Sequence, residues 1–173
     1  AVRTVFRDTV NPVVSLTPGD DANLATARPP LRAAYADPSP SSDLDLLSFS
    51  ATVNGTPVGG QFTVGATEAT FTPSSDLPDG DVTFIAGIAD RAQNTGSASS
   101  TFRVDTQFPT LSLSPASGTI LTTTAPVFIA IYEDPSPGSG IDESSYHAEL
   151  DFVDATASFA VSPTQATFAV PVG

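Results

Sequence analysis

The sequence has 173 residues, of which 19 are acidic and six are basic, all of them arginine, so its formal net charge is −13. A negative field of this size repels nucleic acid and anionic lipid and attracts divalent cations. The absence of cysteine excludes disulfides and thiolate metal sites. No apolar run reaches the length of about 18 residues that a membrane span needs. We therefore expect neither a nucleic-acid partner nor membrane insertion.

Short segments with apolar residues at every second position follow one another along the chain, which is the period of a β-strand. Proline, glycine and aspartate separate the segments, as they do in turns. The pair Asn54-Gly55 predicts a tight hairpin, because both residues tolerate a positive φ. No helical pattern competes. The strands expected in the first part of the chain are Val13–Thr17, 31–35, 49–53, 62–64, 69–71, Val82–Ala89 and 102–104.

The same pattern returns after 97 residues. Residues 12–76 align without a gap on residues 109–173, so that the strand expected at 49–53 recurs at 146–150. A fixed internal period of this length is typical of an array of like modules. The matched positions include Ser15/Ser112, Leu16/Leu113, Leu24/Leu121, Tyr35/Tyr132, Phe71/Phe168, and the loop Asp37-Pro38-Ser39-Pro40, which recurs as Asp134-Pro135-Ser136-Pro137.

About seven short strands per module predict a two-sheet sandwich. We expect an all-β fold of tandem Ig-like Greek-key β-sandwiches of about 97 residues, the second module being incomplete. Residues 1–9 would be the last strand of a preceding repeat plus a linker, residues 10–106 one domain, and residues 107–173 a second domain that lacks its last two strands. The chain would then be an excerpt of a longer array. The alternative is strand donation, in which residues 1–9 complete the module of a neighbouring subunit, although they supply only one of two missing strands.

Several motifs resemble those of tandem bacterial immunoglobulin-like (Big-type) domains in large cell-surface adhesins. Residues 88–94, Ile-Ala-Asp-Arg-Ala-Gln-Asn, and 102–109, Phe-Arg-Val-Asp-Thr-Gln-Phe-Pro, are similar to the strand end and linker that join such domains. Residues 132–142 resemble their Asp…Ser-Gly-Ile-Asp loop, and residues 77–82 resemble their Leu-x-Asp-Gly turn. The resemblance covers both copies of the repeat.

Two positions depart from the family pattern. Gln93 stands where these repeats usually have glycine, and the first copy has Ser41-Ser42-Asp43-Leu44-Asp45 in place of Ser-Gly-Ile-Asp. The resemblance implies an extracellular or cell-surface location and neighbouring repeats of the same chain as partners. It also implies calcium near the joints between domains.

Aspartates recur at strand ends and in loops, which a head-to-tail array would bring to the joints between modules. Hard oxygen ligands in groups of three or more suit Ca²⁺. The alternative is ordinary turn chemistry, in which these side chains accept hydrogen bonds from nearby backbone amides. The candidate Ca²⁺ ligands are Asp90, Asn94, Asp105, Asp134 and Asp142 at one joint, and Asp8, Asp37 and Asp45 at the preceding joint.

We do not expect catalysis. His147 is the only histidine and falls at an outward position of an expected strand, and no glycine-rich phosphate loop precedes a helix. We expect a non-enzymatic stalk of spacer repeats in an adhesin-like array, stiffened by Ca²⁺ at its joints. The alternative is a self-associating structural subunit of an extracellular filament, sheath, surface layer or phage fibre, whose partners would be copies of itself.

Overall fold

The computed structural model describes residues 7–171. Its regular elements are β-strands and three 3-10 helices of three residues each, which confirms the all-β prediction. The chain divides into two compact units, one up to Thr106 and one from Gln107 onward, where the repeat also divides the sequence. The strand expected within residues 1–9 lies for the most part outside the described residues. No helix within residues 7–171 is long and apolar enough to cross a membrane.

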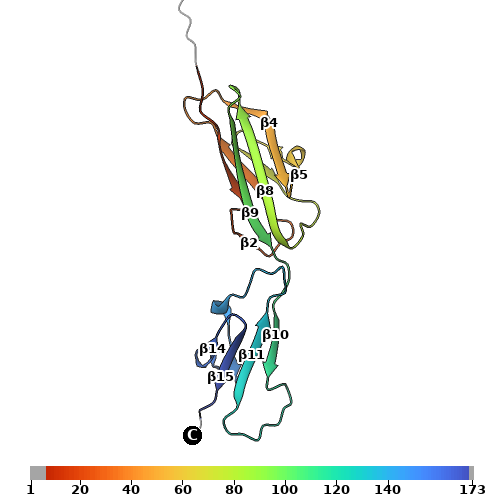
Figure 1. The fold of residues 1–173 in the computed structure, drawn as a ribbon, viewed down its shortest axis with the longest axis vertical. Coiled ribbons are helices and arrows are strands. Elements are labelled where there is room, and N and C mark those ends of the chain that lie inside the picture. The colour runs from red at the N-terminus through yellow and green to blue at the C-terminus, as the bar shows by residue number, and fades with distance from the viewer. Residues whose placement is uncertain (1–6, 172–173) are drawn as a thin grey trace, which may run out of the picture. The chain divides into compact units, whose positions relative to one another are not determined.

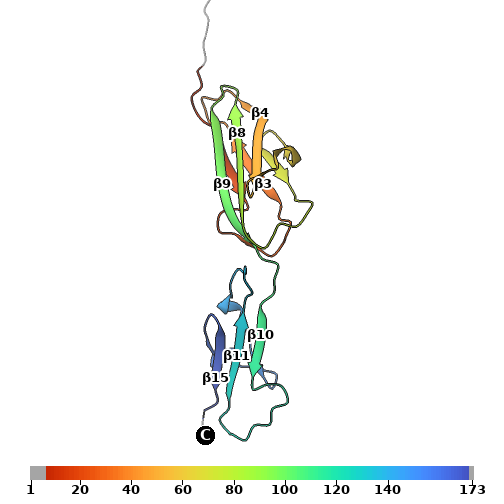
Figure 2. The same cartoon turned by 45° about the vertical axis from the view of Figure 1, so that its right-hand side comes forward.

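The first unit is a sandwich of two sheets, which Figures 1 and 2 show from two sides. One sheet has the order β1-β3-β7-β6 and the other the order β2-β9-β8-β4-β5. Pairing is antiparallel throughout, except between β2 and β9. The elements are β1 (Val13–Thr17), β2 (Asn23–Leu24), β3 (Leu31–Ala36), β4 (Leu44–Val53), β5 (Thr56–Pro57), η1 (Gly59–Gln61), β6 (Thr63–Val64), β7 (Glu68–Phe71), β8 (Gly80–Asp90) and β9 (Thr95–Val104).

Alternate residues of facing strands form the core between the two sheets. Leu31 of β3 and Phe84 of β8 are fully buried, and burial alternates along both strands as the period-two pattern predicts. The ring of Phe62 lies 5.3 Å from the rings of Phe49 and Phe71 and 5.8 Å from that of Phe84, measured between centroids. Burying each such ring stabilises the fold by roughly 1.5–3 kcal/mol.

The hairpin of β8 and β9 sets which loops share an end of this sandwich. Its turn follows Ala89, which pairs with Thr95, whereas its open end lies where Gly80 pairs with Val104. A residue just before the turn and a residue just after β9 are therefore separated by the whole length of the ladder. This geometry decides which acidic residues can meet.

The second unit repeats the first sheet of the sandwich in the order β10-β11-β15-β14, and adds a separate two-stranded ribbon of β12 and β13. The repeated tyrosines have equivalent hydrogen bonds: Tyr35 donates its hydroxyl to the carbonyl of Gly65, and Tyr132 donates to that of Ser162. The elements are β10 (Thr110–Ser114), β11 (Val127–Glu133), η2 (Glu143–Ser145), β12 (Glu149–Leu150), β13 (Val153–Asp154), η3 (Thr156–Ser158), β14 (Ala160–Val161) and β15 (Gln165–Ala169).

One expected strand is largely missing from the second unit. Only Glu149–Leu150 of the segment 146–150 is a strand, and His147 is an exposed residue that precedes it. The equivalent strand β4 of the first unit pairs along Ser50–Val53 with β8. Residues 107–171 contain no counterpart of β8, so the segment lacks the neighbour that would hold it extended.

Candidate functional site

Three aspartates from separate parts of the first unit converge near one end of its sandwich. Asp8 precedes β1, Asp37 follows β3 and Asp90 ends β8, and one carboxylate oxygen from each lies within 4.8 Å of the other two. The antiparallel register explains the meeting of the first two. Val13 at the start of β1 pairs with Ala36 at the end of β3, so the flanking segments leave the sheet side by side.

Two backbone amides hold the carboxylate of Asp8. Its Oδ1 accepts a hydrogen bond from the Val10 amide at 2.9 Å, and its Oδ2 accepts one from the Ser42 amide at 2.8 Å. The Val10 hydrogen bond is the main reason that the pKa of Asp8 lies below its ordinary value of 3.8, with partial burial acting in the opposite direction. Asp8 is therefore ionised at neutral pH.

Asp90 is the most buried of the three acids, with 1% of its surface exposed. Its Oδ1 accepts from the backbone amide of Asn94 at 2.8 Å, and its Oδ2 accepts from the side-chain nitrogen of Asn94 at 2.6 Å. Within this turn Gln93 has a φ of 69°, a backbone conformation that glycine adopts more readily than other residues. Asn94 meets Asp90 through its side-chain nitrogen and so supports the turn.

Asp37 leaves one of its oxygens without a partner. Its Oδ2 accepts from the Ser41 hydroxyl at 2.6 Å and from the Ser42 amide at 3.1 Å. Its Oδ1 is buried and has no hydrogen-bond partner. A buried carboxylate oxygen without a hydrogen bond is costly, typically by about 1–3 kcal/mol or more. Turn chemistry thus explains one oxygen of Asp37 and leaves the other unexplained.

Within residues 7–171, no arginine forms an ion pair with the three aspartates of the cluster. Arg91 follows Asp90 in the β8–β9 turn, but its guanidinium lies 3.8 Å from the carboxylate of Asp43, and both side chains are largely exposed. Three carboxylates this close repel one another unless a cation or a proton joins them. Oxygen ligands alone suit a hard cation such as Ca²⁺, which takes six to eight oxygens. The three aspartates therefore fit the calcium that the family resemblance implies, with backbone carbonyls or water needed to complete the shell.

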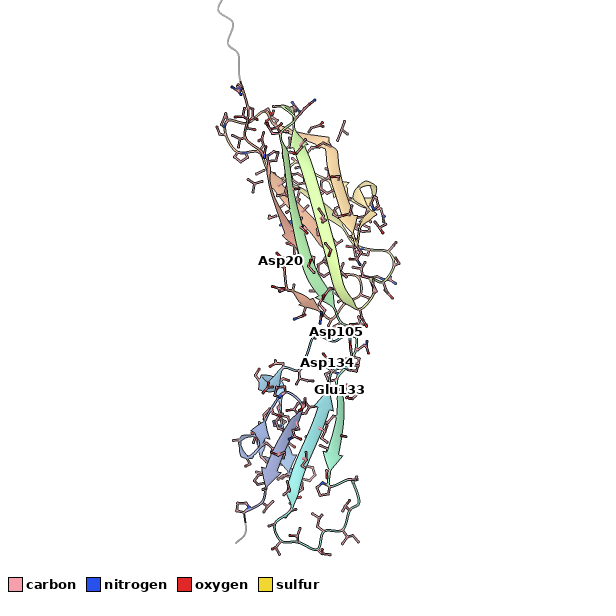
Figure 3. The ribbon with its side chains drawn as sticks, viewed as in Figure 1. Asp20, Asp105, Glu133 and Asp134 are labelled. Carbon is pink, nitrogen blue, oxygen red and sulfur yellow. The ribbon has the colours of Figure 1, made fainter. Side chains whose placement is uncertain are left out.

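The expected grouping of Asp90 with Asp105 is wrong. The two residues lie at opposite ends of the β8–β9 hairpin, because Asp90 precedes its turn and Asp105 follows the end of β9. Asp90 instead joins Asp8 and Asp37, which had been assigned to a different joint. Asp105 and Asp134 are the repeats of Asp8 and Asp37, and Figure 3 labels each within its own unit, along with Asp20 of the first unit.

Two other candidates make only local bonds. Asp45 accepts from the Leu47 amide at 3.1 Å within the irregular part of β4. Asp142 caps η2, accepting from the amide and the hydroxyl of Ser144 at 3.0 and 2.6 Å. Both bonds lower the pKa of Asp142, and the bond from the Ser144 hydroxyl contributes most. For both residues the turn chemistry predicted as the alternative is what the structure shows.

Asp134 reproduces the unusual feature of Asp37 in the second copy. Its Oδ1 is also buried without a hydrogen-bond partner, while its Oδ2 accepts from the Gly140 amide. A Cβ added at Gly138 would lie 2.3–2.6 Å from atoms of the Asp134 carboxyl group, so the carboxyl group would have to move to admit a side chain there. The unpaired oxygen is therefore a property of the repeated loop.

Ser42 also belongs to the site, although it was not among the residues predicted to do so. Its amide donates to both Asp8 and Asp37, and its hydroxyl accepts from the Ala92 amide at 3.1 Å. Ser42 thus links the loop after β3 to the β8–β9 turn. Its recurrence as Ser139 in the repeated loop was the only available signal.

Comparison with protein-family models and with curated proteins finds no match. Among solved structures, the crystal structure of CopC from Methylosinus trichosporium OB3b is similar, with 12% sequence identity and a TM-score of 0.44. The match covers 55% of this chain and 94% of that one. A likeness of this strength carries no argument about function, which must come from the geometry of the site.

Proposed function

We propose that this chain is a non-enzymatic structural protein whose Ig-like β-sandwich repeats act as spacers in an extracellular array and bind Ca²⁺ at Asp8, Asp37 and Asp90. One observation carries the proposal. Carboxylate oxygens from three separate segments lie within 4.8 Å of one another, and Asp37, one of the three residues, also has a buried oxygen without a hydrogen-bond partner. The 97-residue repeat supports the array, and the resemblance to adhesin domains supports the location outside the cell.

The position of Asp8 explains why calcium would matter to a spacer. Asp8 stands in the segment that enters the sandwich ahead of β1, whereas Asp37 and Asp90 belong to loops of the sandwich itself. A cation shared by the three carboxylates would replace their mutual repulsion with attraction and tie the entering segment to the domain. Affinities of about 10⁻⁴–10⁻³ M are usual for extracellular calcium modules.

The surroundings of the single histidine support a role without catalysis. His147 Nδ1 lies 3.1 Å from Thr156 Oγ1, and His147 Nε2 lies 3.3 Å from Glu149 Oε1. The three side chains thus stand in the order hydroxyl, imidazole and carboxylate that a catalytic triad has. The hydroxyl of Thr156 is already engaged with the backbone of Ala148, whose amide donates to it at 3.0 Å. The side chains of His147 and Glu149 are 62% and 54% exposed, so water screens any charge that would activate the hydroxyl.

Calorimetric titration with Ca²⁺ tests the proposed site. We expect one saturable binding event in the chain, and its loss in Asp37→Asn, because the substitution removes a charge and one of the converging oxygens. Asp21→Asn is the matched control. Asp21 is exposed, has a φ of 60° that asparagine also tolerates, and lies outside the cluster.

Two results would contradict the proposal. One is the absence of saturable Ca²⁺ binding at millimolar concentration. The other is equal binding by the chain and by Asp37→Asn. Either would leave Asp8, Asp37 and Asp90 as turn residues only.

A further inference from the structure

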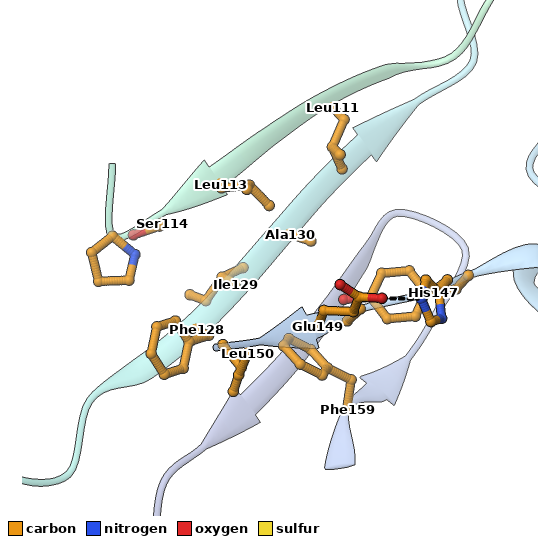
Figure 4. Close-up of a pocket in the computed structure, with 13 residues that line it drawn as sticks. Leu111, Leu113, Ser114, Phe128, Ile129, Ala130, His147, Glu149, Leu150 and Phe159 are labelled. Atoms are coloured by element: carbon orange, nitrogen blue, oxygen red, sulfur yellow. Dashed lines mark hydrogen bonds and ion pairs between the residues drawn. The ribbon is translucent and has the colours of Figure 1, made fainter. Parts of the chain in front are cut away.

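The second unit has an open apolar face where the first unit has its core. Leu111 and Leu113 of β10 are 63% and 64% exposed, whereas their repeat partners Val14 and Leu16 pack partly buried against the core of the first unit. A cavity of about 390 Å³ opens at this face (Figure 4). The apolar side chains that line it include Leu113, Phe128, Ala130, Tyr146, Leu150 and Phe159.

The first unit shows what covers the equivalent face. Val82, Phe84, Ala86 and Ile88 of β8 are buried against it, together with Phe102 and Val104 of β9. Phe84 stacks on Phe62 with a centroid distance of 5.8 Å and an interplanar angle of 14°. The hairpin thus supplies half of that core.

The aromatic cluster that receives Phe84 is repeated in the second unit. Its rings are linked in sequence at centroid distances of 6.1, 5.6 and 5.6 Å, close to the 6.0, 5.3 and 5.3 Å of the first unit. Phe159 takes the place of Phe62. Residues 107–171 contain no counterpart of Phe84. The two clusters are Tyr35, Phe49, Phe62 and Phe71, and Tyr132, Tyr146, Phe159 and Phe168.

The second unit also lacks the strand pairing that this hairpin provides in the first unit. Ser50–Val53 pairs with β8, but of the equivalent residues 147–150 only the last two form a strand. Asn23–Leu24 pairs with β9, but the equivalent residues 120–121 form none, and Ile120 is 90% exposed. An apolar small molecule or a lipid would cover the side chains but would not pair with the backbone of these segments as a strand does. A β-hairpin would do both.

We propose that the open face of the second unit is a docking site for a β-hairpin of the β8–β9 type, and that residues 77–106 of this chain, supplied as a separate polypeptide, occupy it. In the first unit Val53 pairs with Phe84 and Ala51 with Ala86. The repeat transfers this register to the second unit, so that Phe84 of the added hairpin pairs with Leu150 and its ring packs on Phe159. The β8 part of the hairpin runs antiparallel to residues 147–150.

The test adds a fluorescently labelled peptide of residues 77–106 to the full chain. We expect saturable one-to-one binding by fluorescence anisotropy, and slower hydrogen exchange of the amides of residues 147–150. The peptide variant Phe84→Ala should bind about tenfold more weakly or worse, because aromatic anchors dominate interfaces of this kind. The variant Ile85→Ala is the matched control, since Ile85 is 42% exposed and points away from the core.

A second arm does not depend on the solubility of a free hairpin. Residues 77–106 are joined through a flexible linker to the end of the chain after Gly173, and we expect the second unit to unfold at a higher temperature than in the original chain. In the fused chain, the substitution Phe159→Ala should abolish this gain in melting temperature. Phe152→Ala, which alters a residue that is 98% exposed, should preserve it.

Three outcomes would overturn the inference. The first is no binding together with no gain in stability on fusion. The second is binding of the peptide without slower exchange at residues 147–150, which would show that the peptide occupies another part of the chain. The third is self-association of the chain without peptide that protects residues 147–150. That result would make a second copy the occupant and favour the self-associating subunit over the spacer.

Discussion

The two oxygens of Asp37 differ in their surroundings, so the turn and the proposed cation would use different atoms of one side chain. Its Oδ2 accepts the two hydrogen bonds of an ordinary turn from Ser41 and Ser42. Its Oδ1 remains unpaired, and the same division recurs at Asp134. Because a carboxylate offers about four acceptor sites, the two roles do not compete. The sequence presented them as alternatives, since a repeated Asp-Pro loop is compatible with either.

At the residue scale we predict a pH-dependent role for Asp154. Its Oδ1 accepts from the Thr156 amide at 2.8 Å, and this bond is the main cause of a pKa below the ordinary 3.8. A lowered folded pKa stabilises the fold above the unfolded pKa, and that contribution is lost as the pH falls through the folded pKa. Asp154→Asn should therefore lower the melting temperature of the second unit slightly at neutral pH, and by less at an acid pH near the lowered pKa. Melting curves at both pH values check this, and an equal loss at each would contradict it.

At the scale of the element, Gly96 of β9 marks where β1 and β9 approach most closely. A Cβ there would lie 2.0 Å from the carbonyl oxygen of Pro12, which is backbone and cannot rotate away. We predict that Gly96→Ala destabilises the first unit by about 1–3 kcal/mol or more, because the strands must separate. Urea unfolding measures the change. Gly19→Ala is the control, since its Cβ would meet nothing within 4 Å, and equal effects of the two variants would refute the explanation.

The two-residue alternation of apolar side chains predicted correctly the strands that have a neighbouring strand within the described chain. It was wrong for a segment that has no such neighbour. The alternation at 31–36 became β3, flanked by β1 and β7. The alternation at 146–150 is equally regular, yet only Glu149–Leu150 of this segment forms a strand. The short β2 was not predicted, because two residues show no period and their parallel pairing with β9 depends on the packing of the whole unit. Alternation reports which residues can face a core, whereas a strand also needs a partner.

At the scale of the whole chain, the repeat predicted the division into two units, and it did not predict which acidic residues meet. Asp90 was grouped with residues of the following module because it ends a strand and precedes them in sequence. The hairpin reverses the direction of the chain after Asp90, which places this residue at the end where β1 begins. The hairpin topology determines which aspartates meet. The sequence alone does not show at which end of the sandwich each loop lies, so it could not predict this grouping.

The two units differ in core size, and this difference predicts how the chain melts. Among residues 7–171, the core of the first unit contains 13 buried apolar residues, including Phe84 and Phe102, whereas that of the second contains only Ala130, Tyr132 and Ala166. Since buried apolar area is the dominant stabilising term, we expect two calorimetric transitions, with the second unit unfolding first.

Calcium should move only the upper of these two transitions, because Asp8, Asp37 and Asp90 all belong to the first unit. At ten times its dissociation constant the ion would add about 1.4 kcal/mol, which for a domain of about 100 residues corresponds to a rise of roughly 5–10 °C. Scanning calorimetry with calcium and with chelator measures the rise. A shift of the lower transition alone, or equal shifts of both, would place the bound ion elsewhere and remove the link between the carboxylate cluster and the rigidity of the spacer.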